Sequence, residues 1–140
     1  MSLHISDDIR TALLADASIT ALLGTWNGAP AVFTRRPPPN NAPYPQIIVN
    51  PVDVNDMDAL VSRRSIVEMD IAIYGQKSSD TRSVENLGLL VRSLFHRQRF
   101  SITPSGVSVV QIVCRGPLVG PTDDTNLLVR IVILRVTLKE

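Results

Sequence analysis

The sequence predicts an α+β fold in which two α-helices pack on one face of a single antiparallel or mixed β-sheet of about four to five strands. The clearest observation is a change of hydrophobic period within residues 64–99, from the two-residue repeat of a strand to the 3.6-residue repeat of a helix. Short turns join the strand-type segments, which favours antiparallel neighbours with the helices gathered on one face. A length of 140 residues, 44% of them hydrophobic, fits one domain over residues 1–140.

The first element is a helix predicted over residues 5–15. Residues 6–8, Ser-Asp-Asp, place capping and acidic side chains in its first turn, where the helix dipole favours them. A second capping sequence follows and predicts a break, then a short helix over about residues 17–23 that Gly24 ends. The apolar stripe of the first helix consists of Ile5, Ile9, Leu13 and, more loosely, Leu14.

Loops rich in turn residues and proline frame the next strands. A turn-rich loop is predicted over residues 25–30 and a short strand over residues 31–34. The proline-rich residues 35–45 exclude helix and central strand, because proline fixes φ and lacks the backbone donor. They predict a stiff, extended surface loop, and a ligand for a proline-recognising module is the disfavoured alternative. Residues 46–50 predict a buried strand, extended to residue 54 as a bulged edge, before a hairpin connection over residues 55–62.

The central strand is predicted over residues 64–76. One face is apolar throughout residues 67–73, whereas the opposite face carries Glu68 and Asp70. After a polar turn the period becomes helical from Thr81, which predicts the main covering helix. Its apolar face consists of Val84, Leu87, Val91, Leu94 and Phe95.

Two strands close the chain, over residues 107–114 and 126–139, with a loop over residues 116–125 between them. The last strand is apolar on both faces in its first half. Two helices cover only one face of a sheet, so the second face needs a cover of its own. A folded-back hairpin of the same chain and a neighbouring subunit are the alternatives, and we favour the subunit. One face carries Leu128, Val132, Leu134, Val136 and Leu138, interrupted by Arg130, and the other carries Leu127, Val129, Ile131 and Ile133.

The composition argues against several classes of function. A formal net charge of +1 creates no global field that would attract DNA or a membrane surface. Aromatic residues make up 4% of the chain, which leaves few stacking platforms for single-stranded nucleic acid. No apolar run approaches the ~18 residues of a membrane span, and the N-terminus lacks the pattern of a signal peptide. Cys114 is the single cysteine, as expected in a reducing compartment, and we expect a soluble protein made in the cytoplasm.

Glu68 and Asp70 are the most suggestive catalytic candidates. They stand two residues apart on one strand face, so their carboxylates could lie close enough for acid–base chemistry. On the outer face of a sheet, however, such carboxylates are more often solvated or paired, here with Arg63 or Arg64.

The other candidate residues for a functional site are interpreted as structural or solvated side chains. His4 and His96 have no second histidine or cysteine at metal-ligand spacing, and His96 fits a helix C-terminus. Cys114 has the pattern of a buried, inert thiol. Three groups of arginines could contact phosphates or an acidic partner if they converge in the fold. Solvated arginines are the favoured interpretation. The groups are Arg35 with Arg36, Arg63 with Arg64, and Arg92, Arg97 and Arg99. Asp53, Asp56 and Asp58 lack calcium-loop spacing. We predict no catalytic, cofactor-binding or metal site.

Four pieces, in order along nearly the whole chain, resemble a known family. They are the leucine-rich helix ending in residues 13–24, the proline-tyrosine strand of residues 42–49, the strand and helix of residues 67–98, and a last strand ending in residues 135–140. In this order the chain resembles the small tail-completion, or tail-terminator, proteins of long-tailed bacteriophages and phage-like particles. It departs from their pattern in the Pro37–Pro39 run and in the loop over residues 116–125.

The resemblance implies a structural virion protein of the tail or neck and no enzyme. Such proteins form rings, commonly six-fold, which cap the tail tube at full length and present a surface to the head-side connector. The implied partners are other copies of the chain, the tail tube protein and the connector or stopper protein. DNA would pass through the lumen without sequence-specific binding, and assembly would take place in the host bacterial cytoplasm. The alternatives are a head–tail connector or stopper and, more weakly, a small enzyme or regulatory domain that uses Glu68 and Asp70 or the arginine pairs.

Overall fold

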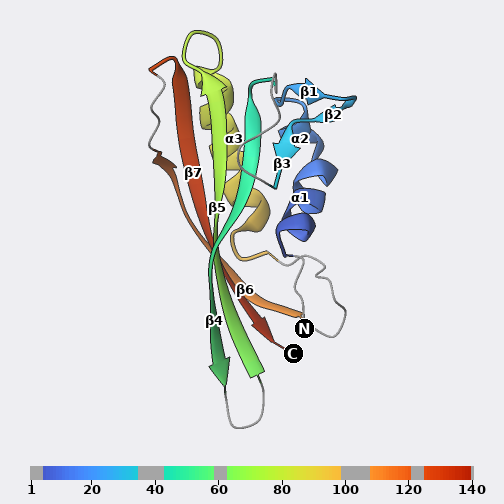
Figure 1. Ribbon diagram of the computed structural model, residues 1–140, viewed down its shortest axis with the longest axis vertical. Helices are drawn as coiled ribbons and strands as arrows, with labels where there is room; N and C mark the ends of the chain where they lie inside the picture. The colour runs from blue at the N-terminus through green and yellow to red at the C-terminus, as the bar shows by residue number, and fades with distance from the viewer. Residues whose placement is uncertain (1–4, 35–42, 59–62, 99–107, 121–124, 140) are drawn as a thin grey trace.

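A computed structural model describes residues 5–34, 43–58, 63–98, 108–120 and 125–139. Its helices lie together on one side of a long, twisted sheet (Figure 1), so the predicted α+β class is confirmed. The elements in chain order are α1 (Ile5–Ala15), α2 (Ala17–Thr20), β1 (Thr25–Trp26), β2 (Ala29–Pro30), β3 (Val32–Phe33), β4 (Gln46–Asp58), β5 (Arg63–Gln76), α3 (Thr81–Phe95), β6 (Ser108–Val119) and β7 (Leu127–Lys139).

The main sheet has the strand order β3-β4-β5-β7-β6 and is mixed. All its neighbours are antiparallel except β3, which pairs parallel with β4 over two residues. β5 lies at the centre and pairs along its length with β4 on one side and β7 on the other. The predicted bulge in β4 is present as a register shift between Pro51 and Asp53. β6 and the short β3 therefore form the two edges of the sheet.

The core lies between the helices and one face of the sheet, called here the inner face. At its centre Ile71 of β5 pairs with Val49 of β4 and Val132 of β7, and all three side chains are fully buried. The two long helices supply apolar stripes at helical spacing, which is why these amphipathic segments fold against the sheet. Those stripes are Ile5, Ile9 and Leu13 on α1, and Val84, Leu87, Val91 and Phe95 on α3.

The residues predicted as a turn-rich loop contain a second, two-stranded sheet. β1 and β2 form a tight hairpin around Asn27 and Gly28, both of which have positive φ, at 49° and 80°. Asn-Gly is the pair that favours such a two-residue turn, because both residues tolerate the left-handed conformation. The prediction of a loop over residues 25–30 is therefore wrong, and this dipeptide was the signal that could have shown the hairpin.

Two strand pairs are longer than the sequence predicted. β4 runs to Asp58 and β5 starts at Arg63, so part of the predicted connection over residues 55–62 is strand. Their far ends extend beyond the helices in Figure 1. β6 continues to Val119 through the predicted loop at Gly116 and Pro117, where the pairing with β7 shifts register. Proline is tolerated there because β6 is an edge strand. The Pro37–Pro39 run lies outside the described residues.

On the outer face of the sheet, opposite the helices, Val129 and Ile131 lie beside the backbone of Gly120. Gly120 donates its backbone N–H to Val129 O, and a methyl group on Gly120 would lie 2.7 Å from Val129 Cγ1 and 2.8 Å from Ile131 Cδ1. The bare glycine backbone thus lets these two side chains lie against it. Val129 is buried, whereas Ile131 and Ile133 are half-buried. This contact is between neighbouring strands, so the folded-back hairpin and the neighbouring subunit both stay predictions for the cover of the outer face.

Candidate functional site

Glu68 and Asp70, the predicted acid–base candidates, lie on the outer face of β5. Glu68 pairs across the strands with Arg135 of β7, and its Oε1 lies 3.8 Å from Arg135 Nε. Their side chains are 41% and 59% exposed, so water screens this interaction. The structure thus agrees with the interpretation of a solvated or paired carboxylate, but the arginine partner shown is Arg135. The side chains of the predicted partners Arg63 and Arg64 lie outside the described residues.

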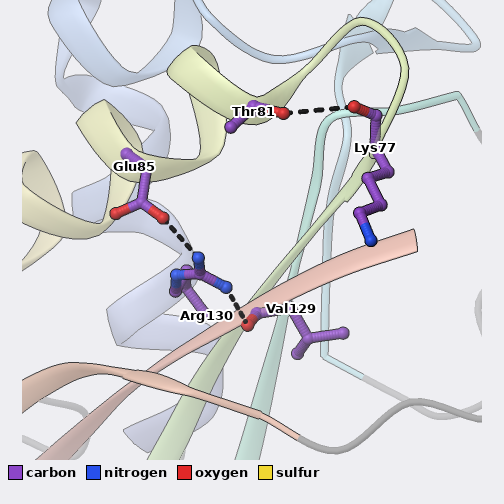
Figure 2. A network of polar contacts seen from close by, with 5 residues as sticks. All are labelled: Lys77, Thr81, Glu85, Val129 and Arg130. Atoms are coloured by element: carbon purple, nitrogen blue, oxygen red, sulfur yellow. Dashed lines mark hydrogen bonds and ion pairs between the residues drawn. The ribbon is translucent and has the colours of Figure 1, made fainter. Parts of the chain in front are cut away.

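A polar link joins α3 to β7 and gives a partner to the arginine that interrupts the apolar face of β7. Figure 2 shows Arg130 reaching towards the helix, where its Nη2 lies 2.5 Å from Glu85 Oε1. Arg130 Nη1 also donates to Val129 O at 3.0 Å, and Thr81 Oγ1 donates to Lys77 O at 3.1 Å in the turn before α3. The side chain of Arg130 is 19% exposed and that of Glu85 is 45% exposed, so this partly solvated ion pair links the helix to the sheet.

The arginine group at the end of α3 is structural where the structure describes it. Arg92 Nη1 donates to Gly116 O of β6 at 2.8 Å. One turn earlier, a methyl group on Gly88 would lie 2.7 Å from Pro117 Cβ, so the helix backbone packs closely on the proline ring. Arg35, Arg36 and Arg99 lie outside the described residues, so the expected convergence of the arginine groups stays a prediction.

The end of α3 covers the middle of the edge strand β6. His96 Nδ1 accepts a hydrogen bond from Cys114 N at 3.1 Å, and Arg97 N donates to Ile112 O at 2.9 Å. Arg97 has a φ of 58°, the left-handed conformation that turns the chain at the helix end. These two bonds occupy strand-edge groups that would otherwise be open to another strand. The sequence did not predict this role of His96 in covering the edge of β6. No sequence pattern indicates a hydrogen bond to Cys114, which is 18 residues away.

Cys114 is buried on the inner face, as the sequence predicted. Burial raises the pKa of its thiol from the ordinary 9.0 to about 11, while the positive charge of Arg92 lowers it by less. A thiol with such a pKa is protonated near neutral pH, and the protonated form is a poor nucleophile.

Exposed large hydrophobic side chains gather on one edge of the molecule. Among the residues that the structure describes, five such side chains are at least 37% exposed, and four of them lie on β6. The fifth, Leu89, follows the α3 glycine that packs on Pro117. The five are Leu89, Val110, Val113, Leu118 and Val119, with Val119 the most exposed at 80%. Exposed apolar groups concentrated in this way are typical of an interaction surface.

The structure also has a small polar hollow at the end of the sheet next to the first turn of α3. It has a volume of roughly 270 Å³ and is lined by Tyr44, Gln76, Ser78, Asn126 and Leu127. These lining residues include no carboxylate, histidine or cysteine. No group of three or more histidine, cysteine, aspartate or glutamate residues in the described ranges could hold a metal ion. None of the described helices is long and apolar enough to cross a membrane.

Similarity to known proteins shows the family of the chain. The sequence family described as tail completion protein gp17 matches residues 7–136, which is nearly the whole chain. The chain belongs to this family. The resemblance drawn from the order of its elements is therefore confirmed, and this tail completion protein is a structural component of a virion tail.

A solved structure supports the same fold. The protein is similar to a chain from the "virion of native gene transfer agent (GTA) particle", with a TM-score of 0.79 and 16% sequence identity over 97% of this chain and 95% of that one. At this identity the likeness shows that the two chains share a fold over almost their whole lengths. No curated protein matches the sequence of this tail completion protein.

Proposed function

We propose that this tail completion protein forms a ring, with six subunits, that caps the tail tube when the tube has reached its full length. The ring then presents a surface to the head-side connector or stopper protein, so that tail and head join. Family membership supports the tail location. The fold shared with a chain of a phage-like particle is consistent with it. The assembly takes place in the host bacterial cytoplasm.

The observation that carries the ring is the apolar surface along β6. An isolated subunit would leave Val119 and its neighbours on β6 in water, and a subunit–subunit contact would remove them from it. A contact between two different patches, repeated around an axis, closes a ring. This is the arrangement that a tube-capping part requires.

The proposed role is structural, without catalysis. Glu68 is solvated beside Arg135, Cys114 is buried and protonated, and His96 is engaged with the backbone of β6. The near-neutral net charge of +1 supports a lumen through which DNA passes without sequence-specific binding, because no strong overall field would hold it there.

Electron microscopy of particles made without this protein tests the proposal. We expect tails that are overlong or unjoined to heads, together with filled heads that lack tails in the same preparation. Supplying the wild-type chain should restore joined tails of uniform length. Tails of normal length that are joined to heads would contradict the proposal, and complete tails beside heads that leak their DNA would point instead to a connector or stopper.

A further inference from the structure

The helix-bearing part of the molecule has two flanks of different character. The β6 flank is defined by Leu89 of α3 and by Arg115, Leu118 and Val119 of β6. Sheet order places β6 at one edge and β3 at the other, and α1 packs on β3 and β4. The α1 flank is defined by the outward side chains Asp7, Thr11 and Ala15 of α1 and by the half-buried Trp26 of β1. Figure 1 shows α1 and the β1–β2 hairpin on the opposite side from the C-terminal end of β6.

The β6 flank is suited to contact through side chains. Val119 is 80% exposed and Leu89 is 57% exposed, although both are apolar. The nearby backbone edge is already used, because His96 and Arg97 bond to Cys114 and Ile112. A partner strand cannot extend the sheet at this point without displacing the end of α3. The occupant of the flank therefore docks on its side chains.

The charges of the two flanks are opposite in sign. The exposed Arg115 gives the β6 flank a positive charge, while nearby on α3 Arg92 already donates to Gly116 O and Glu85 is paired with Arg130. Residues 5–20 carry three aspartates and a single arginine, Arg10, whose Nε donates to Val32 O against β3. Like surfaces would repel one another, whereas a basic flank and an acidic flank attract.

We infer that neighbouring copies of this chain meet head to tail, with the β6 flank of one subunit seated on the α1 flank of the next. The inference rests on the proposed ring and identifies the surfaces that form it. The two patches differ and lie at opposite edges of the sheet, so the contact is heterologous and repeats from copy to copy. Leu89 and Val119 lose their exposure to water in this contact, and Arg115 of the β6 flank faces Asp7 of the α1 flank.

Two complementary variants test this contact. The first, Leu89→Asn with Val119→Asn, replaces the exposed apolar side chains of the β6 flank by uncharged polar ones and keeps the α1 flank. The second, Asp7→Arg with Thr11→Arg, reverses the charge of the α1 flank and keeps the β6 flank. All four positions are exposed, so both variants keep the core, and circular dichroism and thermal melting verify that each is folded. Sedimentation velocity then measures the assembly state of each variant, of their mixture and of the wild type.

The head-to-tail contact predicts a distinctive pattern. The wild type assembles, and each variant alone sediments as a monomer. An equimolar mixture of the two variants forms a dimer of twice the 15.3 kDa subunit mass and stops there, because only one intact contact can be made. The single change Val119→Glu should weaken wild-type association by about tenfold or more, because it places an unpaired charge in the contact.

Other outcomes overturn the inference. If the α1-flank variant dimerises alone, β6 pairs with β6 and the contact is isologous. If both variants assemble like the wild type while Arg135→Glu on the outer sheet face does not, the outer face forms the contact. A wild type that remains monomeric at every concentration also overturns it. The proposed function fails separately, through normally joined tails in particles that lack the protein, and that result leaves the mixing pattern unaffected.

Discussion

Apart from Arg130 on the inner face, both faces of β7 are apolar in sequence over the first half of the strand, yet they differ in their surroundings. On the inner face, Val132 and Leu134 are fully buried under α3. On the outer face, Ile131 and Ile133 are half-buried and Arg135 is exposed. The difference shows that apolar residues on a strand do not by themselves determine burial; the element packed against them does. The inner face therefore carries the stability of the fold, and the outer face and the β6 edge remain available for assembly.

The largest expected effect comes from placing a charge on the inner face. Ile71→Asp puts a carboxylate at a fully buried position between Val49 and Val132, and it should cost about 4 kcal/mol or more of folding free energy. We expect a chain that fails to fold, measured by circular dichroism and urea unfolding. As a control, Ile71→Val should cost only about 1 kcal/mol. A folded, stable Ile71→Asp protein would contradict the central place of this strand.

A smaller effect is expected where α3 meets the edge of the sheet. In Gly88→Ala the added methyl group would lie 2.7 Å from Pro117 Cβ, and the ring cannot move away as a flexible side chain could. The steric cost exceeds the gain in helix propensity, so we expect a net loss of about 1 to 2 kcal/mol by thermal or urea unfolding.

Two further variants check the cause of the Gly88→Ala effect. Ser93→Ala on the exposed side of the same helix should be neutral or slightly stabilising. Combining Gly88→Ala with Pro117→Ala should recover part of the loss, since the ring that the methyl group meets is then gone. An additive double variant would show that the two residues do not touch.

His96 protects part of the β6 edge, and a substitution at this residue removes its hydrogen bond with the Cys114 amide. His96→Ala leaves the Cys114 N–H without its acceptor and should cost about 1 kcal/mol. Hydrogen exchange at the Cys114 amide should become faster, as measured by NMR. His96→Asn should restore slow exchange, because its side-chain oxygen can take the place of Nδ1. Equal exchange rates in all three proteins would mean that the bond does not protect the edge.

Much of the fold could be predicted from the sequence because its periods are regular. Val84, Leu87 and Val91 recur at helical spacing, which predicted both the helix and its buried face. The alternation around Ile71 likewise predicted the strand and its buried face. The helix bounds 5–15 were also predicted correctly, since an apolar stripe at helical spacing and acidic residues in the first turn mark this segment. Local patterns of this kind require no knowledge of distant residues.

The features that could not be predicted depend on contacts between distant residues. The continuation of β6 through Gly116 and Pro117 depends on Arg92 and Gly88 of α3, which hold that segment against the helix. The bond from Cys114 to His96 likewise joins residues with no shared pattern. The β6 flank was not predicted, because exposure of Leu89 and Val119 is a property of the folded surface and not of composition.

The pH dependence of Cys114 gives a weaker test of the inner face. Its folded pKa of about 11 lies above the ordinary 9.0, so the folded state holds its proton more tightly than the unfolded state does. Stability from this group is fully present below pH 9 and is lost as the pH rises towards 11. Urea unfolding of the wild type between pH 9 and pH 11 should show a fall in the free energy of unfolding that is absent in Cys114→Ala. If the free energy of unfolding fell equally in the wild type and in Cys114→Ala, the Cys114 thiol would not be the cause of the fall.

The smallest effect is expected on the outer face, at the pair of Glu68 and Arg135. Both side chains are solvated and their charged atoms lie 3.8 Å apart, so Glu68→Ala should change the unfolding free energy by no more than about 0.5 kcal/mol. Raising the salt concentration should shrink even this difference, because exposed ion pairs are screened. The same variant should support tails of normal length in particles. If Glu68→Ala instead removed a measurable catalytic activity while the protein stayed folded, the outer face would be a chemical site and the structural role proposed for this chain would be wrong.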